Sequence, residues 1–289
     1  MPLDHLHAGR TKDLGGGFLV RRLLPAFPRQ GVGPFVFFDH FGPVTVAPDD
    51  NFDVRPHPHI GLATVTYLFE GAMLHRDSLG KVQRIEPGAI NWMTAGRGIV
   101  HSERRPPDLA RTPYVNHGLQ LWAALPRAAE EVAPAFTHTA ADAIPAWEHE
   151  GNALRLLIGD AFGRRSPVST FVPTLYVDVA ARAGASLTLP ADLGERAVYP
   201  LDAPLDIDGA PVPPHTMAFI ANGEAATVVA PAGARYVVIG GEPLDGPRFM
   251  WWNYVSSSRE RIEQAKDDWR AQRMGHVPGE TELIPLPDK

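Results

Sequence analysis

Frequent turn residues divide this chain into many short apolar runs, and this pattern limits the folds open to it. Glycine occurs 27 times and proline 29 times in 289 residues. The runs between them are rich in β-branched and aromatic residues; examples are LATVTYLF (62–69), TLYVDVA (174–180), ATVVA (226–230) and RYVVIG (235–240). Many short strands separated by turns indicate an all-β sandwich or barrel.

One segment near the C-terminus has a helical pattern instead. In SSSRERIEQAKDDWRAQR, Ser257 and Glu260 have the spacing of a capping box. Ile262, Ala265 and Trp269 fall on one face of the helix that would follow. We therefore expect a short C-terminal helix that packs on a β-domain through a narrow apolar stripe.

The length of the chain fits one large domain or two of ordinary size. The segment 134–152 is rich in turn residues and has little periodicity, so we place a domain boundary there. The expected domains are residues 1–139 and residues 140–289. A weak internal repeat aligns Tyr67 with Tyr199, which suggests two related halves.

That alignment places His57 opposite Leu189 and His59 opposite Ala191. If the halves are duplicated barrels, the second half has lost both histidines. Only the N-terminal half could then hold a metal.

Two histidines stand one residue apart in RPHPHIGLATVTYLFEG, directly before a predicted strand. Residues two apart on a strand share a face, so His57 and His59 form half of a metal site. Pro56 and Pro58 cannot donate to a sheet ladder, which places this segment at the start or edge of a sheet. His5 and His7 have the same spacing, but they lie in a polar terminus with no strand after it, and we expect no metal there.

The second half of the site is expected at MTAGRGIVHSE, where His101 and Glu103 again alternate. His59 and His101 are 42 positions apart, which allows several antiparallel strands between the pairs, so the pairs could meet across a small barrel. The chain has no cysteine, which excludes disulfides, thiolate zinc sites and iron–sulfur clusters. Any metal must therefore be bound by nitrogen and oxygen.

The charge and hydropathy of the sequence exclude two classes of partner. The formal net charge is −6 and no basic block stands out, so direct nucleic-acid binding is not expected. No apolar run is long enough to cross a bilayer, and the N-terminus lacks a signal-peptide core. We expect a cytoplasmic protein.

The sequence resembles the pirin family, a branch of the cupin superfamily. The resemblance rests on five segments: GVGPFVFFDHFGP (31–43), RPHPHIGLATVTYLFEG (55–71), HRDSLG (75–80), MTAGRGIVHSE (93–103) and GLQLWAALP (118–126). It implies a bicupin, with two β-barrel or jelly-roll domains face to face and a metal only in the N-terminal one. The metal ligands of the family fall on His57, His59, His101 and Glu103.

The resemblance also implies a chemistry. Pirins include quercetin 2,3-dioxygenases, so a flavonol or related phenol and O₂ are the expected substrates. Glu103 would be the catalytic base. The expected cofactor is one divalent ion, with Fe(II) favoured and Zn, Mn, Ni, Cu or Co open. Two alternatives remain: a non-enzymatic iron-dependent redox sensor or transcriptional co-regulator that acts through protein partners, and a protein whose metal is purely structural.

Other residues near these motifs have simpler interpretations. His75 is expected to stabilise a turn with Asp77 and Ser78, although it could also lie behind a metal ligand. His40 and His117 are expected to be structural. Arg97 could face either substrate or solvent. A set of aromatic residues could line a pocket, but ordinary barrel core is the simpler expectation: Phe38, Phe41, Tyr67, Phe69, Trp92 and Trp122.

Overall fold

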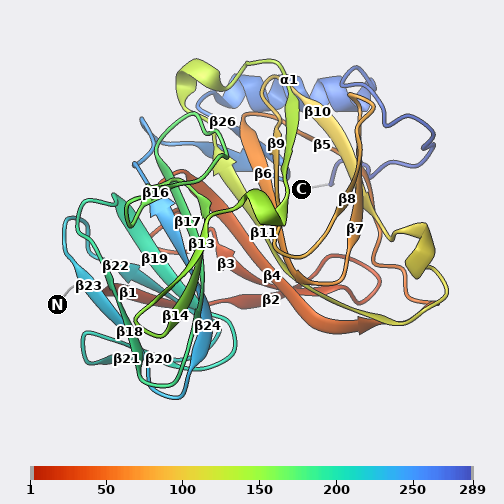
Figure 1. Ribbon diagram of the computed structural model, residues 1–289. Helices are drawn as coiled ribbons and strands as arrows, with labels where there is room; N and C mark the ends of the chain where they lie inside the picture. Colours follow the sequence, from red (N-terminus) through yellow and green to blue (C-terminus); the bar gives the residue numbers. More distant parts are fainter. Residues whose placement is uncertain (1–2, 288–289) are drawn as a thin grey trace. The chain divides into compact units, whose positions relative to one another are not determined.

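The apolar runs form β-strands, as their spacing predicts, and the chain folds into two compact units (Figure 1). The computed structural model describes residues 3–287. The N-terminal unit contains residues 11–21, 39–141 and 245–287, and the C-terminal unit contains residues 3–10, 22–38 and 142–244.

The N-terminal unit contains a large and a small antiparallel sheet. The large sheet has the strand order β12-β9-β6-β11-β4-β3-β2, and the small one has the order β5-β10-β7-β8 (Figure 1). The strands are β2 (Arg10–Asp13), β3 (Leu19–Leu24), β4 (Phe35–Val46), β5 (Val54–His59), β6 (Leu62–Glu70), β7 (Met73–Asp77), β8 (Val82–Ile85), β9 (Ile90–Thr94), β10 (Ile99–Arg104), β11 (Tyr114–Ala124) and β12 (Ala135–Thr139). Residue 10 of β2, residues 22–24 of β3 and residues 35–38 of β4 count with the C-terminal unit.

The C-terminal unit repeats this arrangement. Its sheets have the orders β1-β22-β19-β24-β17-β14-β13 and β18-β23-β20-β21. The strands are β1 (Leu3–Ala8), β13 (Ala146–His149), β14 (Asn152–Ile158), β17 (Thr174–Ala181), β18 (Ala185–Leu189), β19 (Glu195–Pro200), β20 (Leu205–Ile207), β21 (Ala210–Val212), β22 (Thr216–Ile220), β23 (Ala226–Ala230) and β24 (Ala234–Gly241). Position by position, β6 corresponds to β19, which places Tyr67 and Tyr199 on equivalent strands.

Short elements complete the fold. Two hairpins are formed by β15 (Asp160–Ala161) with β16 (Arg164–Arg165) and by β25 (Phe249–Trp251) with β26 (Tyr254–Ser256). The 3₁₀ turns are η1 (Pro107–Leu109), η2 (Arg127–Ala129) and η3 (Ala141–Ala143), and the α-helix is α1 (Arg259–Arg270).

The expected division at residue 139 does not hold at the two ends of the described chain, because each end belongs to the unit formed mainly by the other half of the sequence. The N-terminal segment is itself a strand: β1 pairs with β22, with His5 opposite Phe219 and His7 opposite Met217. Its place in the C-terminal unit corresponds to that of β12 in the other unit. The C-terminal segment belongs to the N-terminal unit because its apolar residues pack there. One boundary, between residues 141 and 142, lies inside the turn-rich segment 134–152.

The C-terminal helix begins one residue later than the sequence suggests. Ser258, not Ser257, is the N-cap, and its hydroxyl accepts a hydrogen bond from the Arg261 N–H at 3.2 Å. Ser257 instead donates its backbone N–H and its hydroxyl to the Glu130 carboxylate. The predicted apolar stripe of α1 is confirmed, since all three of its residues are buried in one cluster with residues of the N-terminal unit: Ile60, Val100, Tyr254, Ile262, Ala265, Trp269 and Val277.

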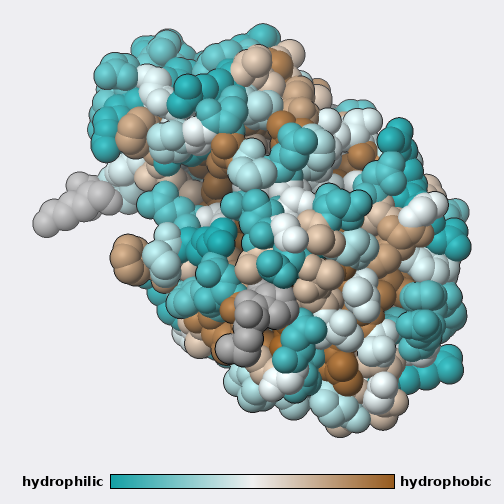
Figure 2. All heavy atoms as spheres, turned by 90° about the vertical axis from the view of Figure 1, so that its left-hand side faces the viewer, coloured by the Kyte–Doolittle hydropathy of each residue, from teal (hydrophilic) through white to brown (hydrophobic). Residues whose placement is uncertain are grey.

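The surface mixes polar and apolar residues. Figure 2 shows teal and brown residues interspersed on one face of the molecule. Within residues 3–287, no helix has both the length and the apolar character needed to cross a membrane.

Candidate metal centre

The two histidine-bearing segments meet as neighbouring strands. β5 pairs antiparallel with β10, which places His57 directly opposite His101 and His59 opposite Ile99. β5 is the edge strand of its sheet, as the prolines in RPHPH predict. Directly after β5, Gly61 has φ +67, and a Cβ at this position would overlap the carbonyl oxygen of Val255. Only glycine at this position lets the backbone after β5 pack closely against the backbone of β26.

His57, His59 and His101 converge on one point. One ring nitrogen from each lies within 4.8 Å of the others. The ring centroids are 4.4 Å apart for His57 and His101 and 5.0 Å apart for the other two pairs. All three side chains are buried. Buried imidazoles in such a cluster are the donors that divalent transition metals prefer.

The hydrogen bonds of two rings show which nitrogen faces the cluster. His57 donates from Nδ1 to the Arg55 carbonyl at 2.9 Å, and His59 donates from Nδ1 to the Asn253 carbonyl at 3.1 Å. A carbonyl oxygen only accepts, so Nδ1 carries the proton and Nε2 keeps its lone pair. His101 Nε2 is buried without a hydrogen-bond partner. His57 and His59 thus each offer an unprotonated Nε2, and the Nε2 of His101 has no protein partner.

Burial keeps these imidazoles neutral. Desolvation lowers the pKa of His57 to about 4. It also lowers the pKa values of His59 and His101 well below the usual value, with further lowering from the neighbouring histidines. A metal therefore does not compete with protons for these rings near neutral pH.

Glu103 lies beside the cluster rather than within the group of three. Its Oε1 is 3.5 Å from His101 Nδ1, and its Oε2 is buried without a hydrogen-bond partner. The register of β5 with β10 shifts between His101 and Glu103, with the extra residue on β5, whereas β10 pairs regularly with β7 across the same residues. His101 and Glu103 therefore keep the alternation expected for them on β10. Burial raises the pKa of Glu103 to about 8, although the positive charge of Arg104 opposes this shift.

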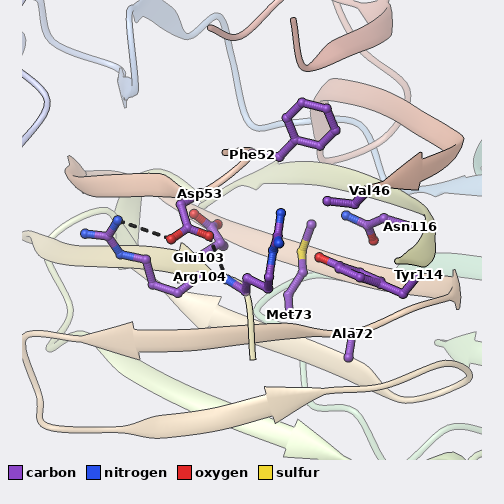
Figure 3. A pocket seen from close by; sticks show the side chains of 10 residues that line it. Val46, Phe52, Asp53, Ala72, Met73, Glu103, Arg104, Tyr114 and Asn116 are labelled. Atoms are coloured by element: carbon purple, nitrogen blue, oxygen red, sulfur yellow. Dashed lines mark hydrogen bonds and ion pairs between the residues drawn. The ribbon is translucent and has the colours of Figure 1, made fainter. Parts of the chain in front are cut away.

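Figure 3 shows the small pocket that Glu103 lines. Its volume is about 10 Å³, which is close to the space that one water molecule needs. Tyr114 and Asn116 also line it. Asp53 forms an ion pair with Arg104 at 3.5 Å and accepts a hydrogen bond from the backbone N–H of Arg105 at 2.7 Å. The carboxyl of Glu103 is therefore enclosed by side chains.

The other candidate residues mostly have structural roles. The expected aromatic residues are buried, as core residues should be, and the Trp122 ring packs edge-on against His59 with centroids 5.1 Å apart. His40 and His117 pair through their Nε2 atoms at 2.9 Å. Arg97 is exposed, and its carbonyl accepts from Arg261 at 2.7 Å.

The C-terminal segment holds both histidine-bearing strands, which sequence reasoning missed. Glu280 accepts from the Ser102 hydroxyl at 2.6 Å and from Arg104 Nε at 3.0 Å, on β10. The Ile284 N–H donates to the Pro56 carbonyl of β5 at 2.8 Å. No local pattern signals these contacts, because the partners lie more than 170 residues apart.

The donor set fits a divalent transition metal. Three neutral imidazoles have inward lone pairs, and a buried carboxylate oxygen without a hydrogen-bond partner lies beside them. Such unpaired polar atoms cost free energy in a buried site unless they have a ligand. His57, His59, His101 and Glu103 would hold the ion.

Comparison with known proteins agrees with this architecture. The Pirin family model matches residues 17–123, and the model for the pirin C-terminal cupin domain matches residues 176–275. A "Pirin-like protein" of Caulobacter vibrioides is 45% identical over 291 residues, covering 99% of this chain and 100% of the relative. A Pseudomonas aeruginosa protein named "Putative quercetin 2,3-dioxygenase" is 38% identical over 262 residues, covering 90% of this chain and 81% of that protein.

A solved structure extends the likeness to the whole chain. The crystal structure of a quercetin 2,3-dioxygenase from Acinetobacter baumannii has a TM-score of 0.91 and 33% identity, covering 99% of this chain and 96% of that one. The expected all-β bicupin fold is thereby confirmed. The chain belongs to the pirin family of the cupin superfamily.

Proposed function

We propose that this protein is a metal-dependent dioxygenase of the quercetin 2,3-dioxygenase type. Its substrates would be O₂ and a flavonol or related phenol, and its cofactor one divalent ion, with Fe(II) favoured. The observation that carries the proposal is the convergence of three buried histidine ring nitrogens beside a buried carboxyl. The names of the Pseudomonas and Acinetobacter proteins support the substrate class.

The proposed chemistry divides between the ion and the chain. A bound divalent cation supplies Lewis acidity towards a phenolic oxygen and, when it is redox-active, electron exchange with dioxygen. Glu103 takes the proton of the substrate hydroxyl on a carboxylate oxygen. Burial raises the pKa of this carboxyl in the metal-free protein, and the same burial favours proton uptake by its carboxylate form.

The surrounding side chains orient the site and keep it dry. The edge of Trp122 restricts the His59 ring, and the backbone carbonyls at 55 and 253 fix the rings of His57 and His59. Buried walls strengthen each electrostatic contact because the local dielectric constant is low.

Oxygen consumption tests the proposal. The protein is purified without O₂, its metal content is measured, and O₂ uptake is followed with quercetin and a panel of other phenols. We expect uptake that His57→Ala abolishes and Glu103→Gln strongly reduces with the metal still bound. His138→Gln is the matched control: His138 also pairs through Nδ1, with Asn91 at 2.8 Å, but lies outside the cluster. A metal-loaded protein that consumes no O₂ with any phenol would contradict the proposal and favour the redox-sensor alternative.

A further inference from the structure

Behind His101 lies a second pair of buried titratable side chains. His75 and Asp77 belong to β7, which pairs with β10 and places Asp77 opposite His101. His75 is 3% exposed and Asp77 is fully buried. His75 Nε2 is 3.0 Å from Asp77 Oδ2, and His75 Nδ1 is 3.4 Å from His101 Nδ1. The His75 ring also stacks on Phe136, with centroids 4.2 Å apart.

The hydrogen bonds of Asp77 determine where the protons in this chain of side chains lie. Asp77 Oδ1 accepts the backbone N–H groups of Leu79 at 2.9 Å and Lys81 at 3.0 Å. A carboxylate only accepts, so the bond from Oδ2 to His75 needs the proton on His75 Nε2. When His75 is neutral, its Nδ1 has a lone pair, and a proton on His101 Nδ1 then completes the contact between the two rings.

This assignment leaves the lone pair of His101 on Nε2, the buried atom without a protein partner. Backbone carbonyls set the tautomers of His57 and His59. His101 is the member of the cluster whose tautomer is set by side chains.

We propose that His75 and Asp77 are positioning residues that fix the tautomer and the ring orientation of His101 for metal binding. The inference rests on the proposed metal site but not on dioxygenase activity. Asp77, rather than His75, accepts the hydrogen bonds that stabilise the turn. His75 lies between Asp77 and His101 and contacts both. Partners of this kind behind a metal ligand typically change metal affinity about 10- to 100-fold when they are replaced.

Asp77→Asn tests the proposal with little change in shape. The side-chain oxygen of the new amide can still accept from the two backbone N–H groups, but its NH₂ group would face His75 Nε2. His75 would then donate from Nδ1, and His101 would carry its proton on Nε2, where it blocks the metal. His75→Phe is the second variant, because it keeps the stacking on Phe136 but removes the contact with His101.

Two readouts decide the outcome. In the metal-free protein, ¹⁵N NMR of the imidazole nitrogens should show His101 protonated on Nδ1 in the wild type and on Nε2 in Asp77→Asn. Competition of Co²⁺ with a chelator should show binding about 10- to 100-fold weaker in Asp77→Asn and in His75→Phe. His138→Gln should change neither readout, and circular dichroism verifies that each variant folds.

Two results would overturn the proposal. One is wild-type His101 protonated on Nε2 in the metal-free protein, a result that needs no variant to fold. The other is Co²⁺ affinity within twofold of wild type in both folded variants. Wild-type protein that shows the expected NMR and Co²⁺ results but no O₂ uptake with any phenol would refute the proposed dioxygenase function and leave the positioning role intact.

Discussion

Metal binding at neutral pH should release about one proton, and Glu103 should be its source. The pKa of this carboxyl is raised to about 8 by burial, so about nine-tenths of it is protonated at pH 7 in the metal-free protein. The three histidines contribute little, because their lowered pKa values leave them neutral already. A carboxyl that coordinates the ion must lose its proton.

The sign of the pH dependence follows directly. Below pH 8 a proton competes with the metal for Glu103, so the apparent affinity should rise with pH, by close to tenfold or about 1.4 kcal/mol per unit. Above pH 8 the affinity should level off, because the carboxyl is already ionised. Near pH 4 the dependence should steepen as His57 begins to bind a proton.

Calorimetric titration with Co²⁺ in buffers of different ionisation enthalpy measures the protons released. We expect about 0.9 at pH 7 and about 0.5 at pH 8 for the wild type, from the same pKa. Glu103→Gln should release close to none, which also corrects for any proton lost from water on the ion, and His138→Gln should behave as wild type. Equal release by wild type and Glu103→Gln would refute Glu103 as a carboxylate ligand.

Three further predictions concern stability. Glu103→Gln should stabilise the metal-free protein at pH 7 by about 1–3 kcal/mol in urea unfolding, because a raised pKa makes the ionised carboxyl increasingly unfavourable from pH 4.5 to 8; equal stability would contradict this. Glu280→Ala should cost about 2–3 kcal/mol and speed Co²⁺ release, since it removes the nearest carboxylate partner of the partly buried Arg104 and the acceptor of the Ser102 hydroxyl; an unchanged release rate would exclude a role in holding β10. Gly61→Ala should lower the thermal midpoint strongly, and a midpoint within about 2 °C of wild type would show that the backbone at Val255 moves aside.

Local patterns predict the strands and the histidine pairs because both depend on neighbouring residues. The run ATVVA forms β23 with the expected bounds, 226–230. RPHPH forms an edge strand because its prolines leave no other place in a sheet. The convergence of His57 with His101 follows from a regular antiparallel register, which alternation along two strands can anticipate.

Contacts between distant segments determine what local patterns miss. The partner of His59 Nδ1 is the carbonyl of Asn253, 194 residues away, and nothing near either residue signals this bond. The strand at Leu3–Ala8 has a polar, half-exposed sequence, and it forms because its backbone pairs with the otherwise unpaired side of β22. The register shift between β5 and β10 before Glu103 places an extra residue on β5, and no local pattern in either strand signals it.

The two units have the same strand arrangement, but only the N-terminal unit carries the candidate metal ligands. β18 and β23 occupy the places of β5 and β10, and their register pairs Leu187 with Val228 and Leu189 with Ala226. Counted along each strand, the four candidate donors correspond to apolar residues of one buried cluster: Leu187, Leu189, Val228 and Ala230. The repeat alignment from sequence is two residues out of register here, because the loop after β18 is longer than the one after β5.

The same strand pairing therefore forms with either set of side chains. Each leucine buried in the C-terminal unit contributes about 1.5–3 kcal/mol, whereas a buried imidazole needs a hydrogen-bond partner to avoid a cost of similar size. The N-terminal unit provides those partners at Arg55 and Asn253, and the chain from Asp77 serves His101 in the same way. Metal binding at this site would thus depend on these partners as well as on the histidines, because the same strand pairing forms in the C-terminal unit without either.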